Sequence, residues 1–392
     1  MNPLNSIKEA VSSISKGEMV VVVDSEEREN EGDLVCAGEK IIPEQVNFMA
    51  KEGRGLICVP VSEKIADKLD LPPMVAENTE NTKCNFTVSV DAKKGTTTGI
   101  SASDRCRTIR AIANAKTLKT DLLRPGHIFP IRSKNGGVLV RAGHTEAAID
   151  IVELAGLTPC AAICEITRED GEMARLPDLI SFAKKHNIKI ISISDLIKYR
   201  RKNEKLIEKR VQSVLSTEYG DFEISIYKDI INNKEHVALT KGKLSKNEDV
   251  LVRVHSECMT GDVFCSTKCG CQKKLSKSLK LIQEHGKGVL VYIRHERNGD
   301  KHSHPIKTCE SQNNGLESQT NLKECGIGAQ ILSDLGVKKI RLLTNNPAKI
   351  IGLKGYGLKI TGKIPLEIKG YRNKKNYLKT KKEQFVHLLK NS

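Results

Sequence analysis

The densest group of side chains that could carry chemistry is the acidic segment DSEERENEGDL at residues 24–34. It places six carboxylates beside one guanidinium, that of Arg28, and it directly follows the apolar run MVVVVD. Carboxylates gathered at the end of a strand could bind a hard divalent cation or transfer protons. A solvated charged loop is the simpler interpretation, and composition alone favours it.

A second group of reactive side chains is the cysteine cluster in RVHSECMTGDVFCSTKCGC, residues 253–271. Cys258, Cys269 and Cys271 form the pattern C-x10-C-x-C, and Cys265 lies between them. Three thiolates without a fourth protein ligand are typical of an open catalytic zinc site. Taken alone this spacing is only moderately specific, and cysteines scattered through a core are a fair alternative.

The elements that must position the acidic segment form a layered α/β domain. Runs of β-branched residues predict strands, and helical spacing of apolar residues predicts helices between them. The predicted strands are MVVVVD (19–24), GLICVPV (55–61), FTVSVDA (86–92), GGVLVRAG (136–143), AAICEIT (161–167) and IKIISIS (188–194). The predicted helices are IRAIANA (109–115), HTEAAIDIVELAG (144–156) and LPDLISFAKKHN (176–187).

The second half has a different, mixed pattern that predicts an α+β or α/β domain. Its predicted strands are DVLVRVHS (249–256), GVLVYIRH (288–295) and KIRLLTN (339–345), and its predicted helices are 272–286 and 326–336. The charged stretch RKNEKLIEKR separates the halves. We therefore expect domains at residues 1–201 and 202–392, with a linker near 200–208 into which a helix continues.

The bulk composition indicates a globular, cytoplasmic protein. A chain of 392 residues with 39% apolar and 29% charged residues can bury two cores. No stretch approaches the roughly 20 apolar residues that span a bilayer, and the first residues predict an amphipathic helix and not a signal peptide. Twelve cysteines in such a chain are better interpreted as reduced thiols or metal ligands than as disulfides.

The net charge of +16 is concentrated in the second half. Residues 1–200 carry 27 basic and 28 acidic side chains, whereas residues 201–392 carry 37 and 20. This asymmetry favours an anionic partner for the second half, such as a nucleotide or a nucleic acid. A lysine-rich solvated surface is the alternative, and charge alone does not separate the two.

Four further motifs change how the acidic segment is interpreted. They are TTTGISASDR (96–105), RPGHIFP (124–130), RAGHTEA (141–147) and CEITREDG (164–171). Together with the acidic segment they resemble 3,4-dihydroxy-2-butanone 4-phosphate synthase over about residues 5–200. The resemblance implies a lyase of riboflavin biosynthesis that uses Mg²⁺ (or Mn²⁺) to convert ribulose 5-phosphate to the butanone phosphate and formate. TENTKCNF (79–86) is a less typical version of a variable region.

Carried over by position, the resemblance implies specific roles. Glu29 and His144 correspond to the Mg²⁺ ligands, and His127 and Glu165 to residues required for turnover. The substrate-binding positions are Arg28, Asp33, Arg141, Ala142, Gly143, His144 and Thr145. A histidine such as His127 is often only a packing residue, and Glu165 could pair with a buried arginine. An acid inside an apolar strand is nevertheless costly unless it is paired or functional, which favours a role for Glu165 in the site. Cys58 is better interpreted as a core thiol.

The second half resembles GTP cyclohydrolase II over about residues 208–367, through RVHSE, the three cysteines, GIGAQIL, LLTNNPAKIIGLKGYGL and IPLEI. The resemblance implies a zinc ion on Cys258, Cys269 and Cys271. It also implies residual GTP-site positions at Arg253, His255, Ser256, Glu257, Thr344 and Lys349. Fused in this order, the two halves resemble a bifunctional riboflavin-synthesis enzyme, and the family implies a homodimer.

The departures from this second family fall together on its chemical positions. Lys274 replaces a glutamine that contacts the nucleotide, HERNGDKH (295–302) replaces QEGRGIGL, and CESQN (309–313) replaces TVEAN. The catalytic D-x-R becomes Asn321, Leu322, Lys323. Asparagine cannot accept a proton as aspartate does, and lysine lacks the bidentate grip of arginine.

We therefore expect a degenerate cyclohydrolase half that keeps zinc as a structural ion, since thiolate-bound zinc contributes to folding. A fully bifunctional enzyme that also hydrolyses GTP is the alternative, with Glu324 as a replacement acid to test. Binding of GTP without hydrolysis stays open. A nucleic-acid-binding role for the basic half ranks last, because that half lacks a recognised motif and is poor in aromatic residues for stacking.

Overall fold

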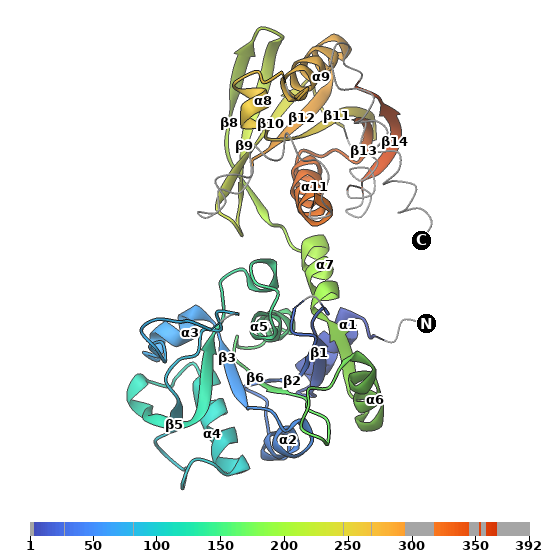
Figure 1. Ribbon diagram of the computed structural model, residues 1–392. Coiled ribbons are helices and arrows are strands. Elements are labelled where there is room, and N and C mark those ends of the chain that lie inside the picture. The colour runs from blue at the N-terminus through green and yellow to red at the C-terminus, as the bar shows by residue number, and fades with distance from the viewer. Residues whose placement is uncertain are drawn as a thin grey trace. The chain divides into compact units, whose positions relative to one another are not determined.

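The computed structural model describes residues 4–26, 28–80, 82–245, 247–267, 269–294, 317–344, 353 and 358–366. The chain divides into two compact units, Met1–Asn203 and Glu204–Ser392 (Figure 1). The last helix of the first unit ends at Asn203, and the first strand of the second begins at Ile207. The helix therefore continues into the predicted linker and ends within it.

The first unit is built on one seven-stranded mixed sheet with the order β4-β5-β3-β6-β2-β1-β7. Its strands are β1 (Val20–Val23), β2 (Gly32–Ala37), β3 (Cys58–Val61), β4 (Val90–Ala92), β5 (Leu122–Arg132), β6 (Ala161–Glu165) and β7 (Lys189–Ser192). Its helices are α1 (Ile7–Ser15), α2 (Pro43–Phe48), α3 (Glu63–Lys68), α4 (Ala102–Ala113), α5 (His144–Leu154), α6 (Leu176–His186) and α7 (Ile193–Asn203). Short helical turns are η1 (Met49–Gly53), η2 (Lys119–Asp121) and η3 (Gly137–Leu139).

Helices cover both faces of this sheet, which can be followed in Figure 1. Val21 and Val23 of β1 belong to a core with residues of α2, α3, α4 and α6. Val20 and Val22 point the other way, into a core with residues of α1, α5 and α7. A strand buried on both faces has a continuous apolar sequence because neither set of alternate side chains meets water. The predicted layered α/β class is therefore confirmed.

One predicted strand of the first half is wrong. Residues 136–143 form the 3₁₀ turn η3 and a loop, because Gly136 and Gly137 have φ angles of 92° and 60°. Such left-handed backbone interrupts a strand and is favourable mainly for glycine. The sequence pattern also missed β2 and β5. In β5 two prolines, Pro125 and Pro130, mask the strand pattern.

The second unit contains another seven-stranded sheet, with the order β14-β13-β11-β12-β10-β9-β8. Its strands are β8 (Ile207–Thr217), β9 (Gly220–Asp229), β10 (Lys234–Lys241), β11 (Asp249–Ser256), β12 (Gly288–Ile293), β13 (Lys339–Leu343) and β14 (Lys359–Ile364). Its described helices are α8 (Met259–Asp262), α9 (Cys271–His285) and α11 (Glu317–Asp334). Strands β11 to β14 pair in parallel and β8 to β10 antiparallel, so this domain is mixed as well.

Helices α9 and α11 lie against opposite faces of the second sheet. Leu251 and Leu290 share a core with residues of α9. Val254 and Ile293, three residues further along the same strands, approach Gly328 of α11. Alternation along a strand then places Arg253 and His255 of β11 on the same face as α9.

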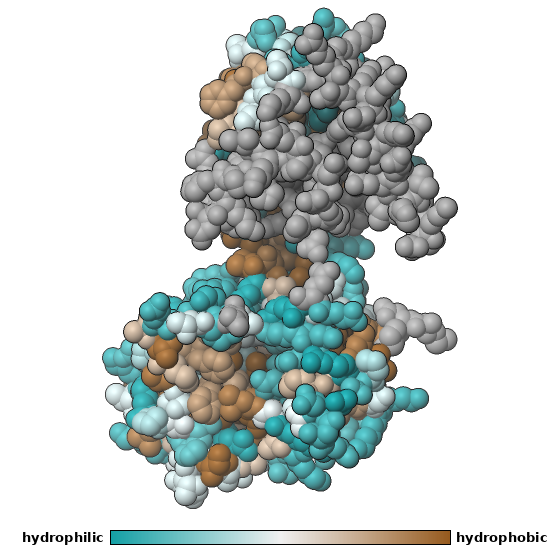
Figure 2. All heavy atoms as spheres, viewed as in Figure 1, coloured by the Kyte–Doolittle hydropathy of each residue, from teal (hydrophilic) through white to brown (hydrophobic). Residues whose placement is uncertain are grey.

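The surface view in Figure 2 shows hydrophilic and hydrophobic residues mixed over the visible face of the first unit. Large apolar side chains that are exposed in this unit include Ile100, Leu118 and Leu123. None of the helices in the described part of the chain is long and apolar enough to cross a bilayer.

Candidate active site

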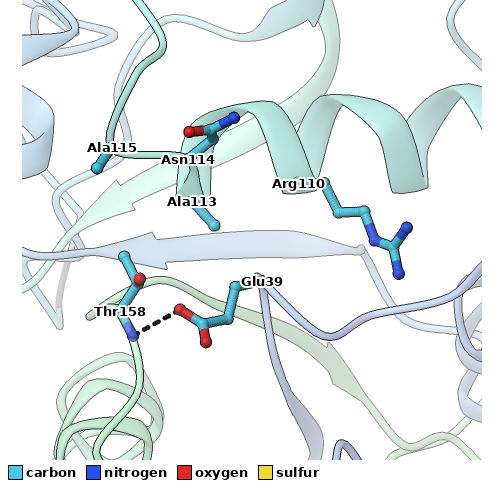
Figure 3. A pocket seen from close by; sticks show the side chains of 6 residues that line it. All are labelled: Glu39, Arg110, Ala113, Asn114, Ala115 and Thr158. Carbon is cyan, nitrogen blue, oxygen red and sulfur yellow. Dashed lines mark hydrogen bonds between the residues drawn. The ribbon is translucent and has the colours of Figure 1, made fainter.

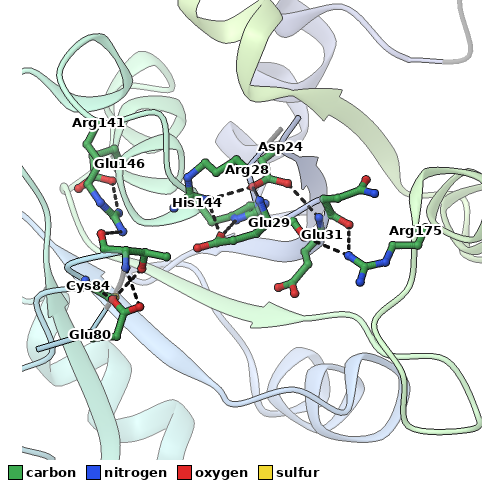
Figure 4. Close-up of polar contacts among 12 residues, drawn as sticks. Asp24, Arg28, Glu29, Glu31, Glu80, Cys84, Arg141, His144, Glu146 and Arg175 are labelled. Atoms are coloured by element: carbon green, nitrogen blue, oxygen red, sulfur yellow. Dashed lines mark hydrogen bonds and ion pairs between the residues drawn. The ribbon is translucent and has the colours of Figure 1, made fainter. Parts of the chain in front are cut away.

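A cluster of two carboxylates and one imidazole lies where β1 ends and α5 begins. Asp24, Glu29 and His144 each offer a ligand atom, and these atoms lie within 4.8 Å of one another. His144 Nδ1 is 3.7 Å from Glu29 Oε2 (Figure 4). The structure thus brings together the two predicted Mg²⁺ ligands, from positions 115 residues apart, and adds Asp24, which the sequence reasoning did not name.

The acidic segment is held in a tight loop by Asp24 itself. Its carboxylate accepts hydrogen bonds from the backbone N–H groups of Glu29 (3.1 Å) and Glu31 (2.9 Å), and from Arg28 Nη1 (2.9 Å). Arg28 also pairs with the Glu29 carboxylate. From the other side, Arg175 donates to the carbonyl oxygens of Glu29 (3.0 Å) and Asn30 (2.6 Å). The segment is therefore a loop held by hydrogen bonds to Asp24 and Arg175, with Ser25 and Glu26 exposed.

His144 is the first residue of α5, which follows the loop residue Gly143. It is buried, and its Nε2 has no hydrogen-bond partner among the described residues. Burial alone would lower the pKa of His144, but the charges of Asp33, Glu29 and Asp24 raise it to about 9. The hydrogen bond from His144 in turn lowers the pKa of Glu29.

These features fit a divalent cation. The cluster has excess negative charge, which the structure compensates by favouring a protonated imidazole. A bound cation would compensate the same charge and displace that proton, because a metal-ligating histidine must be neutral. Mg²⁺ typically takes one or two carboxylates and keeps water or substrate oxygens in its other positions. The orphaned imidazole nitrogen and the two carboxylates are suitable for that kind of site.

Asp33 and Glu165 extend the site across neighbouring strands. They are register partners of the antiparallel pair β2–β6. Burial raises the pKa of Asp33 to about 7, so this carboxyl can be protonated near neutrality. Glu165 Oε2 accepts a hydrogen bond of 2.8 Å from the Leu56 N–H. The predicted alternative for Glu165, a pair with a buried arginine, is not found among the described contacts.

Arg141 lies at the other side of the cluster. Its Nη1 donates to buried Glu146 at 2.7 Å, and its Nη2 donates to the Thr82 carbonyl at 3.1 Å. Glu146 also accepts the Lys134 N–H, so the Arg141 guanidinium is held in one orientation. A Cβ atom at Gly143 would lie 2.5 Å from Arg141 Nη1, which explains why glycine is needed there.

The remaining predicted positions of this segment lie beside Arg141. Ala142 precedes Gly143, whose N–H donates to the Arg141 carbonyl at 2.9 Å. Thr145 is buried on α5 and hydrogen-bonds to Cys84, a half-buried thiol whose pKa is raised mainly by burial. Cys58 is buried in β3, as predicted for a core thiol. Glu80 accepts the N–H groups of Thr82 and Cys84 and fixes the turn that meets Arg141.

His127 does not contact the Asp24–Glu29–His144 cluster. It lies on β5, which β3 and β6 separate from β2. Its Nδ1 is 2.7 Å from Asp91 Oδ2, and its N–H donates to the same carboxylate at 3.0 Å. Three strand spacings amount to about 14 Å, which is too far for direct contact with the acidic loop. His127 is thus one half of a separate Asp–His pair.

A depression in the first unit lies away from this cluster. It is lined by Glu39, Arg110, Ala113, Asn114, Ala115 and Thr158 (Figure 3). Glu39 accepts the Thr158 N–H at 2.9 Å, and Arg110 donates to the Ile41 carbonyl at 2.7 Å. These two charged groups already have protein partners, and none of the predicted site residues lies there.

In the second unit the three predicted cysteines come together. The Sγ atoms of Cys258, Cys269 and Cys271 lie within 4.8 Å of one another, and none of the three is in a disulfide. Burial and the neighbouring sulfurs raise the pKa of Cys271, so a cation would be needed to stabilise its thiolate. Cys265 is exposed and does not belong to this group. The arrangement fits a zinc ion with three sulfur ligands.

Beside the cysteines lies a polar group that sequence reasoning missed. Asp262 accepts hydrogen bonds from the Cys258 N–H (2.8 Å) and from Tyr292 (2.9 Å), and it lies 3.0 Å from His255 Nε2. Arg253 is buried and donates to the Leu343 carbonyl at 2.9 Å. The dipeptide Gly261-Asp262 was the only signal for this role in the sequence.

The other predicted positions of the second unit are only partly described. Ser256 and Glu257 follow His255 at the end of β11, and Thr344 is buried after β13. Lys274 lies on α9. Lys349, the segments 295–302 and 309–313, and the side chains of Asn321 and Lys323 lie outside the described residues.

Comparison with known proteins places both units. The family model "3,4-dihydroxy-2-butanone 4-phosphate synthase" matches residues 8–199, and "GTP cyclohydrolase II" matches residues 208–365. Riboflavin biosynthesis proteins RibBA from Endomicrobium trichonymphae and Aquifex aeolicus (strain VF5) are each 50% identical to the chain, and each alignment covers 98% of both proteins. The chain belongs to the RibBA family of riboflavin biosynthesis proteins. It therefore contains a synthase domain followed by a GTP cyclohydrolase II-type domain, as the sequence motifs predict.

Two solved structures are similar to this RibBA-family chain. RibBX from A. baumannii is a two-domain 3,4-dihydroxy-2-butanone 4-phosphate synthase with 39% identity and a TM-score of 0.72. The match covers 92% of this chain and 99% of that one. A 3,4-dihydroxy-2-butanone 4-phosphate synthase in complex with two magnesium ions has 39% identity and a TM-score of 0.50. That match covers 51% of this chain and 98% of the other.

Proposed function

We propose that this protein converts D-ribulose 5-phosphate to L-3,4-dihydroxy-2-butanone 4-phosphate and formate in its first unit, and that its second unit no longer hydrolyses GTP. The observation that carries the proposal is the Asp24–Glu29–His144 cluster, which is suited to one divalent cation. Glu29 and His144 would hold Mg²⁺, and Mn²⁺ could replace it. When bound, the ion stabilises negative charge that develops on substrate oxygens.

The neighbouring side chains suit the substrate's two ends. Arg141, held by Glu146, provides a fixed guanidinium, and the Thr145 N–H in the first turn of α5 adds a donor for a phosphate. Arg28 and Asp33 border the cation position from the acidic loop and β2. The reaction begins with enolisation, which requires a base beside a carbon acid. Glu165 and Asp33, register partners on adjacent strands, are the carboxylates suited to proton transfers there. His127 is paired with Asp91 away from this cluster, and we assign it no step within the same chain.

For the second unit we propose a zinc ion on Cys258, Cys269 and Cys271 with a structural role. The three sulfur atoms converge, whereas the cyclohydrolase D-x-R positions hold Asn321 and Lys323. The two-domain neighbour RibBX carries a synthase name alone, which supports a single activity. The alternative is a bifunctional enzyme that also converts GTP to 2,5-diamino-6-ribosylamino-4(3H)-pyrimidinone 5′-phosphate, formate and diphosphate. Similarity to the RibBA relatives extends over both halves of the chain, and it does not favour that alternative over the single activity.

We further propose a cytoplasmic homodimer. The ten cysteines in the described part of the chain form no disulfide, which suits a reducing compartment. Exposed apolar side chains on the first unit, among them Leu56, Ile100 and Val140, suit a protein interface. A nucleic acid or a membrane has no role in this proposal.

One purified sample assayed with two substrates tests the functional proposal. Ribulose 5-phosphate with Mg²⁺ should give formate and the butanone phosphate, and GTP with Zn²⁺ should give no pyrimidine product. Pyrimidine product at a rate comparable to formate release would overturn the proposed loss of cyclohydrolase activity. Absence of formate from ribulose 5-phosphate would overturn the first assignment.

A further inference from the structure

A buried ion pair lies behind the active-site segment and outside the reaction described above. Asp150 of α5 accepts a hydrogen bond of 2.7 Å from Arg200 Nη1 of α7. The side chains are only 3% and 11% exposed. Burying two charges is costly, and it is favourable only when the geometry is good and the remaining polar atoms are bonded. This pair therefore needs a reason beyond general stability.

Two further bonds of the pair are made to one backbone turn, η3. Asp150 Oδ2 also accepts the Val138 N–H at 2.9 Å, and Arg200 Nη1 also donates to the Gly136 carbonyl at 3.0 Å. A Cβ atom at Gly137 would lie 1.8 Å from Asp150 Oδ1 and 2.5 Å from Arg200 Nη1. The turn is thus fitted closely against the ion pair, which has no room for any side chain at Gly137.

From this turn the chain runs directly into the predicted substrate segment. The N–H groups of Val140 and Arg141 both donate to the Gly137 carbonyl, at 3.0 and 3.1 Å. The Gly143 N–H then donates to the Arg141 carbonyl, and His144 follows. A displacement at Gly136 or Gly137 would therefore be transmitted through short backbone bonds to Arg141 and His144.

We propose that Arg200 is a positioning residue for the synthase reaction: through Asp150 and the Gly136–Gly137 turn it fixes the backbone that presents Arg141 and His144. The inference rests on the proposed function of that site. It makes α7, the last element of the first unit, part of the support of the active site. Burial raises the pKa of Asp150 to about 7, which the Arg200 charge opposes, so the carboxylate depends on its partner.

The test compares Arg200→Met with Arg200→Lys in the full chain. Arg200→Met should raise KM for ribulose 5-phosphate about tenfold and weaken Mn²⁺ binding several-fold, measured by electron paramagnetic resonance of free Mn²⁺. Arg200→Lys keeps a charge that can reach Asp150, and it should recover most of both losses. Lys198→Met, an exposed change on the same helix, should leave all values unchanged.

Leu196→Ala provides the stability control, because Leu196 is buried on α7 without belonging to the turn. All assays are made at least 15 °C below the lowest Tm of the set. If Arg200→Met and Leu196→Ala lower Tm alike and neither changes KM or Mn²⁺ affinity, the pair is only structural and the proposal is wrong. A wild-type protein without synthase activity would refute the proposed function, whereas the Mn²⁺ comparison would still decide whether Arg200 positions His144.

Discussion

The two units of this protein keep different parts of their sites. In the first, the proposed cation ligands, the arginine proposed to bind phosphate and the Asp150–Arg200 pair are all present, and Arg141 and the pair are each hydrogen-bonded within the unit. In the second, the parts that hold the fold remain, such as the cysteines and the Asp262 anchor. By the sequence resemblance, Lys274, Asn321 and Lys323 stand where the family has residues that act on GTP, and we propose that this activity is lost.

This difference follows from what each kind of residue contributes to stability. Converging thiolates and a buried hydrogen-bonded aspartate stabilise the folded state when zinc is bound. A catalytic acid or a phosphate-binding arginine contributes little to folding and is often strained or poorly paired. When activity is no longer selected, such residues can change freely while the framework cannot. If the second unit has lost its reaction as proposed, this is the pattern of kept and changed residues that we expect.

The largest effect should come from breaking the cation site of the first unit. Glu29→Gln or His144→Ala should lower formate release by about 10³-fold, which corresponds to about 4 kcal/mol of transition-state stabilisation. Formate is measured with ribulose 5-phosphate and Mg²⁺. Glu26→Gln, at an exposed acid of the same segment, is the matched control and should remain active. Normal turnover in His144→Ala would rule out the metal assignment.

Replacing Cys258, Cys269 and Cys271 together by serine should affect the second unit alone. Zinc content, measured by elemental analysis, should fall from about one ion per chain to none. The unfolding transition of the second unit should move to lower temperature, because metal binding contributes to its folding. Synthase activity should change less than twofold. A folded wild-type protein that contains no zinc would contradict the proposed zinc site. Cys265→Ser, at an exposed thiol outside the cluster, is the control.

Asp262→Asn should have a smaller effect of the same kind. The change removes the charge that bonds to His255, Tyr292 and the Cys258 N–H, at a cost of about 2 kcal/mol in the free energy of unfolding of the second unit. Denaturant unfolding in zinc-containing buffer measures this loss. Tyr292→Phe removes one of the three bonds and should cost less. Equal stability of Asp262→Asn and wild type would show that the anchor does not support the cysteine cluster.

The last prediction is that a double change in the second unit has no effect on turnover of GTP. Restoring the family residues by Asn321→Asp with Lys323→Arg should not produce measurable pyrimidine product from GTP, because Lys274 and the segments 295–302 and 309–313 still differ from the family. Product formation is followed with GTP and Zn²⁺. Recovered turnover would mean that positions 321 and 323 alone account for the loss of GTP hydrolysis. The other departures from the family would then have no effect on that loss.

The sequence predicted much of the first site because its ligands occur in compact motifs. The acidic segment and RAGHTEA each form one local structure, and their resemblance to a family fixed which residues matter. The separation of His127 from the acidic loop required the strand order, which a single sequence does not reveal. Strand β5 was missed because prolines interrupt its pattern, although pairing with β3 and β4 stabilises it.

The residues that hold each site in place were harder to predict from the sequence than the site residues themselves. The turn at Gly136 was assigned to a strand because its apolar residues resemble one locally. Its true conformation depends on Asp150 and Arg200, which lie 14 and 64 residues away from it along the chain. Likewise Asp262 acquires its role only when β11, α8 and β12 meet. Long-range hydrogen bonds of this kind leave no periodic signal in a sequence.

The position of Arg200 so near the end of the first unit has a consequence for splitting the gene. A shortened gene that stops after the codon for Asn203 would encode every described element of the first unit, including the pair with Asp150. A gene that stops four codons earlier would encode all the predicted ligands and yet lack the arginine behind them. We expect the longer product to be an independent synthase and the shorter one to fold with weakened substrate binding. A gene of this family could then be divided only after the end of α7, although α7 does not contact the substrate.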